Sequence, residues 1–326
     1  MHKRSTFRVL RIAALVMVGA FLVPSQAADF PTKPIRLVIP FVAGGSTDQI
    51  GRIVADGLTR ELGTAVVADN KAGAGGTIGA ANVASAPKDG YTLLLATSAS
   101  ISMAPNLYTR LSYDPEKSFA PITMIAHGPA VLLVNQNVPV HTVQELLDLA
   151  RQPGSSLSFA SAGAGSIQFT YGSMLNKLAH IHLLHVPYKG GAEAANDVMA
   201  GRVSLMFDSA PSALAVMRTG KVRALAVTSA QRLALLPDVP SINDTVKGFG
   251  TVGWYGLMAP ADTPPDVVVK LNAAMQKVLS NPEASKRLAD MGLLIIPSSP
   301  SEMAKRVKDE IPYYRALASD FGIKPQ

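Results

Sequence analysis

The sequence predicts an α/β fold with two domains, and three observations support this prediction. Apolar runs rich in β-branched residues alternate with segments whose apolar residues recur at helical spacing. Loops of glycine and hydroxyl residues join these apolar runs to the helices that follow them. The chain has 326 residues, which is too long for one ordinary domain and suits two domains of about 130–160 residues each.

The first block of alternating elements precedes residue 122. Residues 35–41 read IRLVIPF, an apolar run typical of a parallel strand that is buried on both faces. In the segment that follows, Ile50, Ile53 and Leu58 fall on one face of a helix, and Gly63 is placed to end it. We expect strands at Ile35–Phe41, Ala65–Ala68 and Tyr91–Ala96, and helices at Asp48–Leu62 and Thr77–Ala84.

A second block of the same kind lies between residues 142 and 228. Thr142 and Glu145 have the spacing of a capping box, so a helix is expected to begin there and to run to Arg151. We expect strands at Leu157–Ala160, Leu183–Val186, Ser204–Phe207 and Val222–Thr228, and helices at Ile167–Ala179, Ala192–Ala200 and Pro211–Arg218.

Two mostly extended segments, Ile122–Val134 and Gly250–Ala259, are interpreted as passages between the domains. The first domain would then comprise residues 29–127 and 251–326, and the second residues 128–250. Because β-α alternation favours parallel strands, we expect parallel sheets in both domains. After the return passage, helices are expected at Pro264–Ser280, Pro282–Met291 and Ser301–Ala318.

Residues 1–28 have the pattern of a signal peptide for secretion. Four cations precede the apolar stretch Ile12–Val23, and Ser25-Gln26-Ala27 fits the rule for cleavage after a small residue, with Ala28 as the neighbouring alternative. The apolar stretch has 12 residues, fewer than the roughly 20 that span a bilayer, and an uncleaved anchor is the less favoured alternative. Removing the four cations lowers the net charge from +7 to +3. We therefore expect the mature protein to be exported.

The composition argues against several classes of function. The absence of cysteine excludes disulfides, thiolate zinc sites, iron–sulfur clusters and a cysteine nucleophile. A mild charge and an aromatic content of 6% argue against nucleic-acid binding.

The motifs of common enzymes are also missing. The glycine segment that begins at Gly73 has Ile78 where a dinucleotide fingerprint needs its third glycine, and no G-x-S-x-G motif occurs. His182 and His185 would face opposite sides of a strand, which disfavours a metal site. We therefore expect no metal, no cofactor and no enzymatic activity, with a secreted hydrolase as the less favoured alternative.

Four loops that follow expected strands are rich in glycine and hydroxyl residues. In open parallel sheets, ligands bind outside the carboxyl ends of the strands. Glycine allows a ligand to approach the backbone closely, and the helix after each loop presents unpaired N–H groups that suit an anion. The alternative is that these loops are ordinary tight turns with capping hydroxyls. The loops are Pro40–Asp48, Thr97–Ser100, Ser161–Ser166 and Tyr188–Gly191.

Two acidic residues near these loops each have two interpretations. Asp48 falls in the first turn of an expected helix, and Asp208 directly follows an expected strand. Each carboxylate either braces its own loop next to the positive end of the helix dipole or contacts an ammonium group or a water molecule of a ligand. The sequence leaves both interpretations open.

Motifs along nearly the whole mature chain carry a family resemblance. They are FPTKPIR at residues 30–36, PFVAGGSTD at 40–48, DNKAGAGG at 69–76, PKDGYT at 87–92, SAGAGS at 161–166, HVPYKG at 185–190, MFD at 206–208 and WYGL at 254–257. In this order they resemble the Bug-type extracytoplasmic solute receptors of the tripartite tricarboxylate transporters, the TctC-like family. The resemblance implies a type II periplasmic-binding-protein fold, in which two α/β domains joined by two crossing strands hold a ligand in the cleft between them.

The resemblance also implies a function and a set of site residues. The protein would capture a small organic mono- or dicarboxylate and deliver it to the membrane permease of such a transporter. A receptor that passes its signal to a sensor protein is the alternative, and we expect a monomer in either case. The implied ligand-binding residues are Phe41, Gly44, Ser46, Asp48, Thr97, Ser98, Ser161, Gly163, Ser166 and Asp208.

Two positions depart from the pattern of the family. Phe169 stands where many relatives have a histidine, and Ile101 lies near a second such position. If both side chains face the cleft, they favour a carboxylate with an apolar or aromatic middle over citrate or aspartate, because unpaired polar groups are costly. Phe169 therefore joins the expected ligand-binding residues, and the alternative is that it packs in the core between its helix and the sheet.

Overall fold

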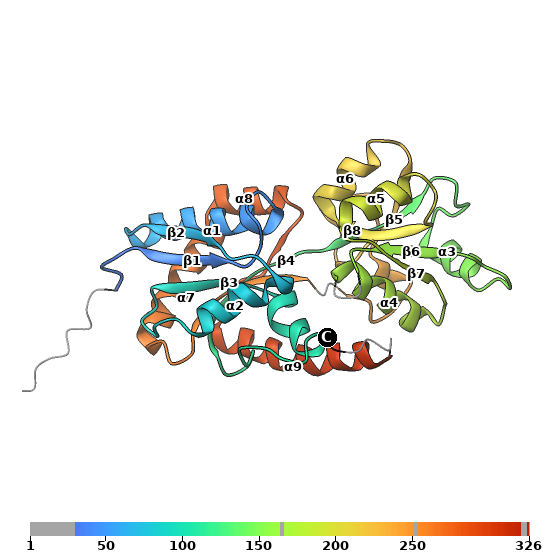
Figure 1. Cartoon of the computed structure of the whole chain (residues 1–326). Coiled ribbons are helices and arrows are strands. Elements are labelled where there is room, and N and C mark those ends of the chain that lie inside the picture. Colours follow the sequence, from blue (N-terminus) through green and yellow to red (C-terminus); the bar gives the residue numbers. More distant parts are fainter. Residues whose placement is uncertain (1–29, 164–165, 251–252, 321–324, 326) are drawn as a thin grey trace, which may run out of the picture.

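The computed structural model describes residues 30–163, 166–250, 253–320 and 325. Within these ranges the chain forms two β-sheets covered by helices, and Figure 1 shows the two resulting lobes side by side. The expected signal peptide, residues 1–28, lies outside the described residues. In the ranges above, none of the helices is both long and apolar enough to cross a membrane.

The first lobe is built on a sheet with the strand order β11-β4-β10-β3-β1-β2. Strand β1 pairs in parallel with β2 and β3, whereas β10 is antiparallel to both β3 and β4. The expectation of a purely parallel sheet is therefore wrong, because β10 enters this sheet from the second lobe. The strands are β1 (Ile35–Ile39), β2 (Val66–Asn70), β3 (Thr92–Thr97), β4 (Phe119–His127), β10 (Trp254–Pro260) and β11 (Leu294–Ile295).

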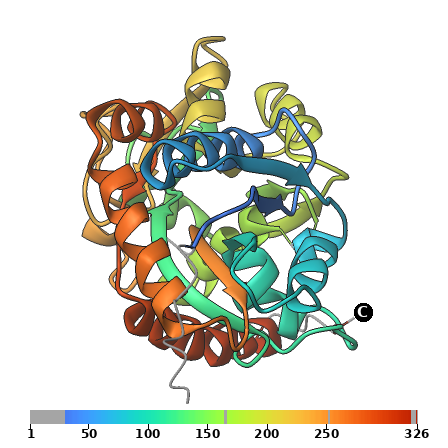
Figure 2. The same ribbon diagram turned by 90° about the vertical axis from the view of Figure 1, so that its left-hand side faces the viewer.

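Helices cover both faces of the first sheet, because successive side chains of a strand point to opposite faces. Leu37 and Ile39 of β1 join the core under α1 and α7, whereas Val38 joins the core on the other face, under α2 and α9. Figure 2 shows α1 above this sheet and α9 below it. The helices are α1 (Ser46–Leu62), α2 (Thr77–Ala84), α7 (Pro265–Ser280), α8 (Pro282–Asp290) and α9 (Pro300–Asp320).

The second lobe has a sheet with the strand order β7-β6-β8-β5-β9. Strand β6 is parallel to β7 and β8, and β5 is antiparallel to β8 and β9. This sheet, too, is mixed rather than purely parallel. Its strands are β5 (Ala130–Asn135), β6 (Ser158–Ser161), β7 (Leu184–Pro187), β8 (Leu205–Ser209) and β9 (Val222–Val227), and its helices are α3 (Val143–Ala150), α4 (Ile167–Ala179), α5 (Gly191–Met199) and α6 (Ala210–Met217).

The chain passes between the lobes at the ends of β4 and β10. Strand β4 ends in the first sheet at His127, and β5 begins in the second sheet at Ala130. The returning chain enters β10 at Trp254, which pairs with His127 across the antiparallel ladder. The N–H of Gly128 donates to the carbonyl of Gly253 at 2.9 Å, so the two passages are hydrogen-bonded to each other.

Helix α9 packs on both lobes. Val307 and Ile311 lie in a core of the first lobe, whereas Tyr314 and Leu317, one turn further on, lie in a core of the second. Figure 1 shows α9 running beneath the first lobe toward α4 of the second. The helix contains Pro312, which has no N–H to donate to the preceding turn. The lobes therefore share α9 as well as the two passages.

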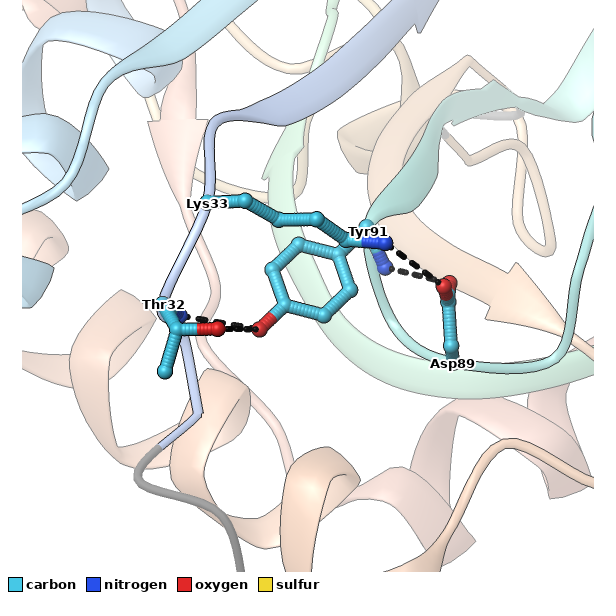
Figure 3. A network of polar contacts seen from close by, with 4 residues as sticks. All are labelled: Thr32, Lys33, Asp89 and Tyr91. Carbon is cyan, nitrogen blue, oxygen red and sulfur yellow. Dashed lines mark hydrogen bonds and ion pairs between the residues drawn. The ribbon is translucent and has the colours of Figure 1, made fainter.

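The first described residues make polar contacts with the first lobe. Figure 3 shows the polar contacts of Thr32, Lys33, Asp89 and Tyr91. The backbone N–H of Thr32 donates to the hydroxyl of Tyr91 at 2.9 Å. Lys33 lies 4.3 Å from the centre of the Tyr91 ring and forms an ion pair with Asp89 at 3.3 Å. These contacts hold the residues that lead into β1.

Candidate ligand-binding cleft

A cleft of about 440 Å³ lies where the two lobes meet. Its walls come from the loop after β1 and the end of β3 in the first lobe, from the start of α4 and the end of β8 in the second, and from the two passages. Both lobes thus contribute side chains to one cavity. The residues that line it are Phe41, Ser46, Thr47, Ile50, Gly75, Thr97–Ala99, Gly128–Ala130, Ser166–Gln168, Tyr171, Phe207–Pro211, Gly253–Tyr255 and Met291–Leu293.

Three helices begin at this cleft. Helix α1 begins at Ser46, α4 at Ile167 and α6 at Ala210, and each of these residues lines the cavity. The N-cap residues of α1 and α6 make no side-chain capping bond. Free backbone N–H groups at a helix start carry a partial positive charge. The cleft is therefore suited to a negatively charged group.

The loop between β1 and α1 is braced by Asp48. One carboxylate oxygen accepts from the N–H of Gly44 and from Nε of Arg52, both at 2.9 Å, and the other accepts from Nδ2 of Asn70 at 3.0 Å. The bond from Arg52, supported by those from Gly44 and Asn70, lowers the pKa of Asp48 to about 2 against the opposing effect of burial. Asp48 and Gly44 do not line the cavity, and this geometry matches the interpretation of Asp48 as a brace of its own loop.

Thr97 and Ser98 line the cleft at the end of β3. The hydroxyl of Thr97 accepts from the N–H of Ser100 at 3.2 Å, which fixes the start of a single π-helical turn, Ala99–Met103. Ile101, in that turn, is fully buried in the core of the first lobe. The condition that Ile101 faces the cleft is therefore not met, because the turn directs this side chain into the core.

The loop of the second lobe is braced by neutral groups. The hydroxyl of Ser161 lies 2.7 Å from Nε2 of His185 and accepts from the N–H of Gly163 at 3.1 Å. Burial lowers the pKa of His185. Ser166 lines the cleft and caps α4, because its hydroxyl donates to the carbonyl of Gly163 at 2.7 Å and accepts from the N–H of Phe169 at 3.2 Å. Ser161 and Gly163 stand behind this surface.

Phe169 does not face the cleft. Its side chain is 8% exposed and packs in the core of the second lobe. The ring lies 4.6 Å from that of His185 and 6.2 Å from that of Phe159, centre to centre. The placement of Phe169 in the cleft is therefore wrong, and the alternative, a core position between α4 and the sheet, is what the structure shows.

Asp208 brings a carboxyl group to the wall of the cleft. One oxygen accepts from the N–H of Ser209 at 2.8 Å, and the other accepts from the hydroxyl of Ser212. Burial raises the pKa of Asp208, although these hydrogen bonds oppose the change. The side chain therefore both braces the start of α6 and faces the cavity. Within the described ranges, no arginine, lysine or histidine lines this cavity.

Much of the remaining wall is aromatic, and the sequence reasoning assigned it no role in the site. Tyr171, Phe207, Trp254 and Tyr255 line the cleft. Burial raises the pKa of the Tyr255 phenol, and the nearby hydroxyls of Thr47 and Ser46 oppose this change. The motif WYGL contained two of these residues, but only as part of a strand. The position of Trp254 and Tyr255 beside the cavity depends on how β10 enters the first sheet.

A cleft between two α/β lobes, lined by both and crossed by two passages of the chain, defines a solute-binding protein. The comparison with protein families gives the particular family. Residues 50–323 match the model of the tripartite tricarboxylate transporter family receptors, TctC, and the chain belongs to this family.

Individual relatives agree with the family. A protein encoded in the tcbD-tcbE intergenic region of Pseudomonas sp. (strain P51) is 36% identical over 318 residues, which cover 97% of this chain and 94% of that one. The solved structure of the periplasmic binding protein BugD is 36% identical, with a TM-score of 0.75 over 91% of this chain and all (100%) of that one.

Two further solved structures contain ligands. Rpa4515 of R. palustris with adipate is 33% identical, with a TM-score of 0.78 over 91% of this chain and 100% of that one. MatC of Rhodopseudomonas palustris with bound malate is 32% identical, with a TM-score of 0.73 over 88% of this chain and 99% of that one.

Proposed function

We propose that the protein binds a small organic carboxylate in the cleft between its lobes. The observation that carries this proposal is the convergence of the starts of α1, α4 and α6 on one cavity. Their N–H groups, with the hydroxyls of Ser46, Thr97 and Ser98, offer a carboxylate several neutral donors. One helix start contributes about 0.3–1 kcal/mol to the binding of a negative charge, and up to about 2 where it is partly buried.

The wall of the cleft favours a ligand with carboxylate ends and an apolar middle. This preference rests on Tyr171, Phe207 and Trp254, which line the cleft. Phe169 and Ile101 do not contribute to it, because they lie in the cores. Burial of apolar surface contributes about 25 cal/mol per Å². Adipate, the ligand of one structural neighbour, has this character because four methylene groups separate its carboxylates.

Asp208 supports a second candidate ligand. A carboxylate in the wall would repel an anion placed beside it and would attract an ammonium group. An amino-dicarboxylate such as aspartate could place its ammonium group at Asp208 and its carboxylates at the helix starts. We rank this ligand second because both oxygens of Asp208 already accept hydrogen bonds from its own lobe.

We further propose that the protein is exported by the signal peptide at residues 1–28 and works in the periplasm as a monomer. It delivers its ligand to the membrane permease of a tripartite tricarboxylate transporter, and delivery to a sensor protein is the alternative. The two domains comprise residues 29–127 with 251–326 and residues 128–250, and they close over the ligand. The pair formed by Ser161 and His185 does not support a hydrolase, because Ser161 is fully buried and lies outside the cleft.

Calorimetric titration of the purified mature protein tests the proposal. Adipate, malate, aspartate and benzoate are compared with 1,6-hexanediol, which has the length of adipate but lacks its charge. We expect adipate to bind most tightly and hexanediol not to bind. If hexanediol binds as well as adipate, or if none of the four carboxylates binds, the proposed ligand class is wrong. If aspartate binds most tightly, the role of Asp208 outweighs that of the aromatic wall.

A further inference from the structure

A buried carboxylate on α9 stands directly behind the cleft. Oε2 of Glu310 accepts from Nε1 of Trp254 at 2.6 Å and from the hydroxyl of Ser102 at 2.9 Å. Oε1 of Glu310 forms an ion pair with Nε of Arg306 at 2.8 Å. Trp254 lines the cleft, and Ser102 belongs to the π-helical turn that follows Thr97 and Ser98. Glu310 therefore connects Trp254, in one wall of the cleft, with the turn that follows Thr97 and Ser98 in another.

The same two residues of α9 meet both passages between the lobes. Nη1 of Arg306 lies 3.3 Å from Nε2 of His127, the last residue of β4. Trp254, bound to Glu310, is the first residue of β10 and the ladder partner of His127. The contacts of α9 thus fall where the chain enters and leaves the first lobe.

Both lobes hold helix α9 close to Glu310. Ile311 lies in a core of the first lobe, and Tyr314 lies in a core of the second. Because both lobes fix the helix, the packing of α9 places the Glu310 carboxylate, in addition to the hydrogen bonds that it accepts from Trp254 and Ser102. The side chain of Glu310 is only 15% exposed, and a buried carboxylate needs its donors, because unpaired it would be costly.

We propose that Glu310 is a positioning residue for ligand binding, which holds Trp254 and the Ala99–Met103 turn in the geometry that the ligand requires. This inference rests on the proposed function, since it assumes that the cleft is the ligand site. Glu310 touches no ligand itself. It acts through Trp254, whose ring forms part of the apolar wall, and through Ser102, which fixes the turn after Ser98.

Replacement of Glu310 by glutamine is the direct test. Trp254 and Ser102 donate to one oxygen of the carboxylate, and Arg306 forms an ion pair with the other. A glutamine amide is neutral, has only one acceptor atom and adds a donor. Asp309→Asn is the matched control, because it is the same change at the next residue, where Asp309 pairs with Lys305 in solvent. Circular dichroism checks that both variants are folded.

Two measurements test the effect of this substitution, the affinity for carboxylates and the fluorescence of Trp254. Calorimetry with adipate and malate is expected to show binding about tenfold weaker for Glu310→Gln, since a hydrogen bond to a charged group is at stake, and unchanged for Asp309→Asn. Trp254 is the single tryptophan of the chain, so tryptophan fluorescence reports on the surroundings of this one side chain. We expect its emission to move to longer wavelength, and its quenching by acrylamide to increase, in Glu310→Gln only.

Each outcome decides the proposal. Wild-type affinity for both ligands in Glu310→Gln overturns it, and so does wild-type emission. If Glu310→Gln does not fold, Ser102→Ala is used as the test instead, because it removes one donor to Glu310. We expect this variant to lose about threefold in affinity. Unchanged affinity in Ser102→Ala would then overturn the proposal. If the wild type binds no carboxylate, the proposed function fails, and the emission of the ligand-free variants still shows whether Glu310 positions Trp254.

Discussion

The two loops that face each other across the cleft are braced in different ways. The loop of the first lobe is held by charge, because Asp48 binds Arg52, Asn70 and the backbone of Gly44. The loop of the second lobe is held by the neutral pair of Ser161 and His185. Both loops end at the start of a helix that lines the cavity. The two loops of one cleft are therefore stabilised by different interactions, one charged and one neutral, and we expect their stabilities to respond differently to mutation and to pH.

The largest expected effect comes from glycines with positive φ in each loop. Gly44 has φ +85° and Gly163 has φ +96°. We expect Gly44→Val and Gly163→Val to abolish binding of adipate in calorimetry, because a β-branched side chain is strained there and the loop must move.

The control for these variants is Gly154→Val. Gly154 has φ +81° and open space around it, so this variant carries similar strain outside the cleft. It should lose stability but retain affinity. Wild-type affinity in both loop variants would show that neither loop shapes the site.

Removal of the charged brace has the next largest effect. Asp48→Asn weakens three hydrogen bonds to a buried carboxylate, and we expect the free energy of unfolding to fall by about 2 kcal/mol, as for a hydrogen bond to a charged group. Urea denaturation measures the change. Asp56→Asn on the same helix is the control, because Asp56 is exposed and its ion pair with Arg287 is long, at 3.8 Å. Equal losses in the two variants would contradict the brace.

Removal of the cap of α4 has a smaller effect. Ser166→Ala deletes the hydroxyl that accepts from the N–H of Phe169, and we expect a loss of about 1 kcal/mol in the free energy of unfolding, typical of an N-cap. Thr142→Ala removes the same kind of cap from α3, away from the cleft. Both variants should lose similar stability in urea, but only Ser166→Ala should also weaken binding of adipate.

The smallest expected effect is a pH dependence that separates the two loops. Burial lowers the pKa of His185 and lowers that of His127 to about 4, so their neutral forms support the fold above the unfolded value of about 6.5. This support is lost as the pH falls below that value, because the unfolded state then binds more protons. Asp48, with a pKa of about 2, keeps its contribution until the pH falls below about 4.

Urea denaturation at pH 7 and pH 5 measures this difference. The wild type should be less stable at pH 5, and His185→Gln should lose less stability over the same interval, with His127 contributing to the loss that remains. The Asp48→Asn variant should retain the full pH dependence of the wild type in this window. A pH dependence that is the same with and without His185 would show that the second loop is not braced by its neutral form.

Local signals predicted most elements well. Helices α2 and α4 occupy the expected ranges, Thr77–Ala84 and Ile167–Ala179, and Gly63 ends α1 in the left-handed conformation at φ 66°. These signals are caps, helical periodicity and glycine, which act over a few residues. The π-helical turn at Ala99–Met103 was not predicted, because its sequence carries no such signal.

The site was predicted less completely than the fold. Phe41, Ser46, Thr97, Ser98, Ser166 and Asp208 line the cleft, whereas Gly44, Asp48, Ser161, Gly163 and Phe169 stand behind it. Gln168 and Phe169 are neighbours in α4, yet Gln168 lines the cleft and Phe169 lies in the core. Successive residues of a helix point in directions about 100° apart, so a motif locates the loop but not the side chain that the ligand meets.

The sequence by itself determined the α/β class and the starts and ends of most helices, because these depend on contacts between residues close together in the chain. Its motifs also carried the family resemblance. Only the tertiary structure decided the antiparallel course of β10, the core position of Phe169 and the aromatic wall of the cleft. It also paired Glu310 with Trp254, 56 residues away. Such contacts are set by how whole elements pack, and many arrangements of elements satisfy the same local pattern.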